Sequence, residues 1–123
     1  MTGGSHRISY LPSALADLEE ISRYTAQKLG IDAADSMASR LIEGIDTLAS
    51  FPYRRTVYVP LKPLSHEYRT LKIDQYLIFY WIEEETSTVM VAAIAYSRAD
   101  IAHRMAKREQ RDDQHEKTDE RRP

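Results

Sequence analysis

The strongest constraint on the fold is the apolar run YLIFYWI, within a strand-like segment at residues 76–83. Successive side chains of a strand point to opposite faces, so a run that is apolar throughout predicts a central strand covered on both sides. A second strand-like segment, residues 67–73, precedes it across Asp74-Gln75. A third, residues 87–95, follows a polar turn. The sequence therefore predicts a hairpin in the middle of a small sheet.

Two helices are predicted before these strands, after a short first strand at residues 6–10. Pro12-Ser13 opens the first helix, with Ser13 as the N-cap because its hydroxyl can accept from free amides of the first turn. Gly30 ends this helix, since glycine readily takes a positive φ.

A second helix is predicted to begin at Asp32, with Asp35 completing a partial capping box, and to end at Pro52. Its apolar positions recur every three or four residues. Only Gly30-Ile31 joins it to the first helix, so the two should form an antiparallel helical hairpin.

The remaining segments are irregular or charged. Residues 53–65 contain prolines and predict a loop or an edge strand. Residues 98–108 predict a short C-terminal helix. The expected fold is α+β: an N-terminal strand, an antiparallel helical hairpin packed on a small antiparallel sheet of three to four strands, and a C-terminal helix.

Composition limits the class of protein. The 123 residues suit one domain, which we place at residues 6–104, after a flexible leader (1–5) and before a charged tail (105–123) expected to fray or be disordered. With no cysteine, disulfides and thiolate metal sites are excluded, and a reducing cytoplasm is expected. No apolar run is long enough for a membrane span or a signal peptide. His103 and His115 lack partners at metal spacing, so no metal and no cofactor are expected.

Charge is unevenly distributed along the chain. The net charge of −2 disfavours a general nucleic-acid binder. Residues 1–50 hold 4 basic and 7 acidic groups, whereas residues 51–82 hold 5 basic and 2 acidic groups. The middle of the chain is therefore the expected basic surface.

Four sequence segments, taken in order along the chain, resemble those of one protein family. They are ALADLEEISRY, LASFPYR, EYRTLKIDQYLIFYWIEEE and VMVAAIAYSRADIAHRM. Together they resemble the RelE/ParE toxin superfamily of bacterial type II toxin–antitoxin systems. The resemblance implies a toxin neutralised by a cognate antitoxin protein in a hetero-oligomer. Its ParE-like branch inhibits DNA gyrase without nuclease activity, and its RelE-like branch cuts mRNA in the ribosome without a metal.

The ribonuclease reading needs a base, an acid and cations around one phosphate. The resemblance places Lys72 and Arg98 at the positions of RelE-like arginines. Arg104 stands where that branch has a catalytic tyrosine. Tyr96, which shares a strand face with Arg98 by spacing, and His66 are the candidate substitutes.

The gyrase reading needs only a shaped surface, and the acidic hairpin and the Tyr-Ser-Arg-Ala-Asp run resemble that branch more closely. We therefore favour it, and an inactive member that keeps only antitoxin binding remains a further alternative. Arg69 is expected to pair with Glu67 or with a helix carboxylate, and to point away from the face of Lys72, three residues on. The candidate target-binding residues are Arg54, Arg55, Arg69, Arg98 and Arg104.

Overall fold

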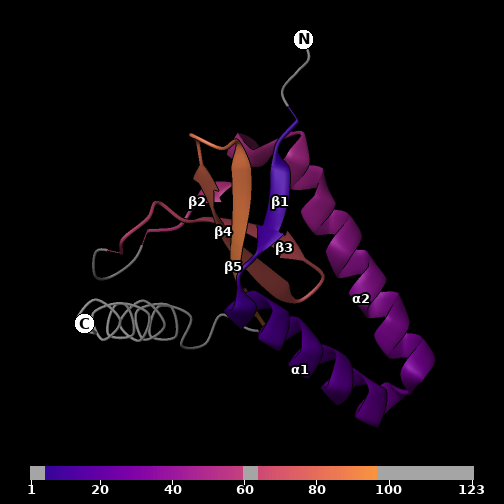
Figure 1. Ribbon diagram of the computed structural model, residues 1–123. Coiled ribbons are helices and arrows are strands. Elements are labelled where there is room, and N and C mark those ends of the chain that lie inside the picture. Colours follow the sequence, from indigo (N-terminus) through magenta and orange to yellow (C-terminus); the bar gives the residue numbers. More distant parts are fainter. Residues whose placement is uncertain (1–4, 60–63, 97–123) are drawn as a thin grey trace, which may run out of the picture.

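Two helices cover one face of a sheet in the computed structural model, which describes residues 5–59 and 64–96 (Figure 1). The predicted C-terminal helix and tail lie outside the described residues. The helices are α1 (Pro12–Leu29) and α2 (Ile31–Asp46). The strands are β1 (Arg7–Tyr10), β2 (Thr56–Val57), β3 (Arg69–Ile73), β4 (Tyr76–Glu83) and β5 (Thr88–Ala95). The predicted α+β fold and helical hairpin are confirmed. No helix in the described ranges is long and apolar enough to cross a membrane.

The sheet has five strands in the order β1-β5-β4-β3-β2. The expected antiparallel sheet of three to four strands is correct for β2 to β5, but β1 also joins the sheet and runs parallel to β5. Parallel neighbours require a long crossover, and the helical hairpin together with β2 to β4 provides it. The segment at residues 53–65 contributes β2 as an edge strand, as expected.

β4 is buried on both faces, as its apolar run predicts. Ile78 and Tyr80 belong to the core beneath the helical hairpin. Phe79 belongs to a second cluster on the opposite face, against which Leu77 and Trp81 pack. The aromatic residues of this strand therefore build the interior on both sides.

The start of α1 is fixed to β5 by polar side chains. Pairing between β1 and β5 ends at Val91, where the Leu11 amide donates to the Val91 carbonyl. Beyond that point the Ser13 hydroxyl donates to the Ala92 carbonyl at 2.8 Å. The buried Asp17 carboxylate accepts from the Ile94 amide at 2.9 Å. α1 thus satisfies backbone groups that β1 leaves unpaired.

The prediction of Ser13 as the N-cap of α1 is wrong. Leu11 occupies the cap position without a side-chain hydrogen bond, and Pro12 is the first helical residue. Proline suits that position because its missing N–H would have no helical partner there. The Ser13 hydroxyl is instead used in the tertiary contact with β5.

Gly30 separates the two helices at φ 100°, as the sequence predicts. Its carbonyl accepts from the Ala34 amide at 3.1 Å, so α2 begins at Ile31, one residue before the expected Asp32. No side chain caps α2, and the partial capping box expected at Asp35 is therefore absent.

α2 also ends earlier than expected. Its last residue is Asp46, and a 3-10 turn at Thr47–Ala49 follows. Pro52 begins a second 3-10 turn, Pro52–Arg54, rather than ending the helix directly. This second turn carries the first pair of predicted target-binding arginines to the surface.

Candidate functional site

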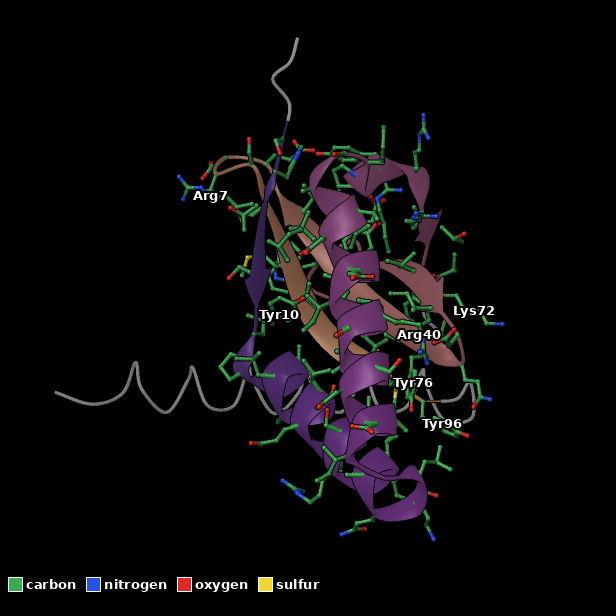
Figure 2. All side chains as sticks on the ribbon, turned by 90° about the vertical axis from the view of Figure 1, so that its right-hand side faces the viewer. Arg7, Tyr10, Arg40, Lys72, Tyr76 and Tyr96 are labelled. Carbon is green, nitrogen blue, oxygen red and sulfur yellow. The ribbon has the colours of Figure 1, made fainter. Side chains whose placement is uncertain are left out.

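Two of the candidate catalytic residues lie on opposite faces of the sheet. Lys72 is exposed on β3 and pairs with Leu77, and it alternates with Leu71, which packs under the hairpin. Tyr96 follows β5, and its ring meets that of Tyr76 edge-on at 5.4 Å between centroids. Tyr76 belongs to the hairpin-side core. Figure 2 shows the Lys72 side chain pointing away from these two tyrosines.

His66 lies in a third place. Its ring stacks on Trp81 with centroids 3.8 Å apart and an interplanar angle of 5°. Trp81 is four residues along β4 from Leu77, the partner of Lys72, which corresponds to roughly 13 Å of strand. The fourth candidate, Arg98, lies outside the described residues. The described candidates therefore do not converge on one reacting group.

Arg69 is used to hold the backbone of the neighbouring loop. Its Nη1 donates to the carbonyls of Tyr53 at 3.3 Å and Arg55 at 3.1 Å. Its Nη2 lies 3.5 Å from Glu67 Oε1, which is one of the two pairings expected from the sequence. The guanidinium also lies 5.4 Å from the centre of the Tyr53 ring.

Tyr80 of β4 also holds this loop. Its hydroxyl donates to the Pro52 carbonyl at 2.6 Å, and both residues are buried. Burial raises the pKa of Tyr80 to about 12, against the opposing effect of Arg69 and Arg55. The phenol is therefore protonated at neutral pH and available as a donor.

Arg54 and Arg55 are exposed on the loop that these contacts hold. The Arg54 guanidinium carbon lies 4.3 Å from the centre of the Phe51 ring. Phe51 and Tyr53 are also exposed, at 48% and 47%. Arg104, the last predicted target-binding residue, lies outside the described ranges.

A groove of about 730 Å³ opens between the helical hairpin and the β3–β4 turn. Across it, Arg40 Nε donates to Asp74 Oδ2 at 2.9 Å, and Arg40 Nη1 donates to the Ser36 hydroxyl at 3.0 Å. Figure 2 shows Arg40, Tyr76 and Tyr96 along this side of the molecule. The lining combines tyrosines, cations and apolar helix residues: Tyr24, Thr25, Lys28, Leu29, Ala33, Ser36, Met37, Arg40, Asp74, Gln75, Tyr76 and Tyr96.

Tyr76 lines this groove, and its pKa is raised above the usual value for tyrosine. Burial is the main cause that raises its pKa, and the carboxylate of Asp74 and two neighbouring tyrosines act in the same direction. A hydrogen bond with Thr25 opposes them. Sequence reasoning missed this groove, because its α2 and turn residues are far apart in the chain and follow no motif.

The described residues include no group of three or more His, Cys, Asp or Glu side chains placed to hold a metal ion. Arginine and aromatic side chains are exposed together at Phe51, Tyr53, Arg54 and Arg55. That chemistry suits recognition of another macromolecule through charge and aromatic contact.

Comparison with known families and structures gives consistent results. Residues 8–101 match the family model described as "ParE toxin of type II toxin-antitoxin system, parDE". A chain of the chromosomal ParDE system of P. aeruginosa superposes with a TM-score of 0.65 at 14% identity, covering 78% of this chain and 100% of that chain. Curated proteins gave no significant match.

Two further structures share the fold. A chain of the RelBE2 complex of Mycobacterium tuberculosis gives a TM-score of 0.54 at 17% identity, covering 75% of this chain and 98% of its own length. A chain of the archaeal RelE-RelB complex of Pyrococcus horikoshii gives 0.52 at 11% identity, with coverage of 77% and 98%. At these identities, the structural similarity establishes the fold.

Proposed function

This chain belongs to the ParE toxin family of type II toxin–antitoxin systems, and we propose that it stops growth by binding DNA gyrase rather than by cutting RNA. The observation that carries the proposal is the separation of Lys72, Tyr96 and His66. A gyrase inhibitor acts as a protein ligand and requires no acid–base pair.

Metal-free RNA cleavage would need those groups within hydrogen-bonding reach of one phosphodiester. Lys72 and Tyr96 lie on opposite faces of the sheet. The His66 ring stacks on Trp81, roughly 13 Å along the strand from the partner of Lys72. Tyr76 and Tyr80 have raised pKa values, which disfavours either phenolate as a general base at neutral pH.

A cognate antitoxin is the second partner that we propose. The solved relatives include toxin–antitoxin complexes, which supports a hetero-oligomer for this chain. The groove beside the hairpin offers apolar helix residues together with tyrosines and cations, which suits an amphipathic segment of an antitoxin. Gyrase and the antitoxin would both be met in the cytoplasm.

Purified protein and reconstituted gyrase test the proposal. We expect dose-dependent loss of supercoiling, and restoration when a stoichiometric amount of the antitoxin is added first. Primer extension on mRNA from cells expressing the chain should show no new 5′ ends. Growth arrest with intact supercoiling and new 5′ ends in translated messages would instead establish the ribonuclease.

A further inference from the structure

The loop at residues 51–55, here called the 51–55 loop, has exposed side chains on a fixed backbone. Phe51 and Tyr53 are about half exposed, and Arg54 and Arg55 are exposed as well. These are aromatic and arginine side chains, the types that contribute most to binding energy at protein interfaces. Most large apolar side chains of the described sheet are buried, so the exposed aromatic rings of this loop form a candidate binding surface.

The backbone of the 51–55 loop is held by side chains from two strands. The Tyr80 hydroxyl of β4 binds the Pro52 carbonyl. The Arg69 guanidinium of β3 binds the carbonyls of Tyr53 and Arg55. A loop fixed in this way loses little conformational freedom when a partner binds, which favours affinity.

The exposed side chains are also arranged among themselves. The Arg54 guanidinium covers the Phe51 ring. The Tyr53 hydroxyl donates to Glu84 Oε2 at 3.0 Å, and its ring meets His6 edge-on with centroids 6.1 Å apart. Tyr53 is thereby oriented without being buried, as an anchor side chain must be.

The charge of the loop indicates the chemistry of its partner. Within the part of the chain that the structure describes, neither Arg54 nor Arg55 forms an ion pair with a carboxylate. Arg69 reaches Glu67, but its guanidinium is occupied by loop carbonyls. Two arginines beside two exposed aromatic rings fit an acidic protein surface that has an apolar recess.

We infer that the 51–55 loop is the surface through which this toxin contacts gyrase, at an acidic patch of that protein. Phe51, Tyr53, Arg54 and Arg55 make the contact. Arg69 and Tyr80 are positioning residues that present it. This inference rests on the proposed function and adds to it the location of the interface.

The test uses two double variants that each remove one exposed arginine and one exposed large side chain. Tyr53→Ala/Arg54→Ala changes the 51–55 loop. Leu15→Ala/Arg23→Ala removes an exposed leucine and an exposed arginine from α1, and neither residue lines the groove. Each full-length protein is titrated into a gyrase supercoiling reaction. We expect the concentration for half inhibition to rise at least tenfold for the loop variant and to change less than twofold for the α1 variant.

A single charge reversal, Arg54→Glu, serves as the control for loss of folding. It keeps the Tyr53 anchor and the backbone contacts of the loop, so its thermal midpoint and its binding to the antitoxin should match those of the parent. It should nevertheless weaken gyrase inhibition by at least tenfold, because the reversed charge opposes an acidic patch.

The possible outcomes distinguish an error in the inferred surface from an error in the gyrase proposal itself. Inhibition by the parent together with equal inhibition by the loop variants overturns the inferred surface and leaves the gyrase proposal standing. Loss of antitoxin binding by Arg54→Glu with gyrase inhibition retained also overturns it, and assigns the loop to the antitoxin. A parent that leaves supercoiling intact at growth-arresting doses overturns the proposed function, and this inference with it.

Discussion

The hydrogen bond from the buried Tyr80 hydroxyl to the Pro52 carbonyl should contribute measurably to the free energy of unfolding. In Tyr80→Phe the ring remains, but the Pro52 carbonyl loses its donor at a site where both residues are buried. Leaving a buried polar group unsatisfied costs about 1–3 kcal/mol. At about 4–8 °C per kcal/mol for a domain of this size, the thermal midpoint at neutral pH should fall by roughly 10 °C.

Because the same hydroxyl can ionise, the difference in unfolding free energy between the parent and Tyr80→Phe should depend on pH. The pKa of Tyr80 is raised from 10.0 to about 12 in the folded protein. A raised folded pKa adds stability that is complete below the unfolded pKa and is lost as pH rises through the folded one. Two pKa units correspond to about 2–3 kcal/mol. This contribution should therefore disappear between pH 10 and pH 12 in the parent, and it is missing from Tyr80→Phe at every pH.

Urea unfolding of both proteins at pH 8 and at several values up to pH 12 measures this effect. The parent should be more stable by about 2 kcal/mol at pH 8, and the gap should close near pH 12. The other tyrosines titrate in both proteins and cancel in the difference. Tyr96→Phe, which changes an exposed ring, serves as the control. A gap that keeps its size from pH 8 to pH 12 would refute the buried hydrogen bond.

Three further predictions concern other contacts. Asp17→Ala removes the acceptor of the Ile94 amide and should destabilise the protein by about 2–3 kcal/mol in urea unfolding, whereas Asp17→Asn, which keeps an oxygen, should cost less. Gly44→Ala gains about 1 kcal/mol of helix propensity in α2 but places a methyl group against Ile73 Cδ1, so the unfolding free energy should change little; in the background of Ile73→Val, which deletes that atom, the same substitution should stabilise the protein in urea unfolding. Lys72→Ala removes an exposed side chain outside the proposed interface. It should leave gyrase inhibition unchanged within twofold, and a tenfold loss would argue for a role of Lys72 in toxicity.

The parts of the fold that follow from local pattern could be predicted from the sequence. The run at residues 76–82 is apolar on both strand faces, and the structure buries that strand on both sides. Gly30 separates the helices because the backbone there takes a φ of 100°. Arg69 and Glu67 are two residues apart, which made their pairing predictable.

Contacts between distant segments could not be predicted in this way. The Ser13 hydroxyl serves a carbonyl 79 residues away instead of its own helix, so local capping rules assigned it wrongly. The parallel pairing of β1 with β5 depends on how the whole hairpin folds back. The hydrogen bond from the Tyr80 hydroxyl to the Pro52 carbonyl joins residues 28 positions apart and has no sequence signature.

For the same reason, the residues of the candidate site could be predicted but their arrangement in space could not. Residue types and family position singled out Lys72, Tyr96 and His66, but only the fold shows that the described three lie apart. Arg54 and Arg55 were expected at a target surface. The hydrogen bonds that fix their loop come from β3 and β4, and no spacing rule connects those residues.

We propose that this toxin acts on gyrase as a binding protein, and this proposal can be tested directly. The most direct measurement is the gyrase cleavage assay, in which trapped enzyme–DNA intermediates appear as linear DNA after detergent and protease treatment. We predict linear DNA that increases with toxin dose, disappears with added antitoxin and persists in Lys72→Ala. No linear DNA at doses that arrest growth, together with new mRNA 5′ ends that Lys72→Ala abolishes, would contradict it.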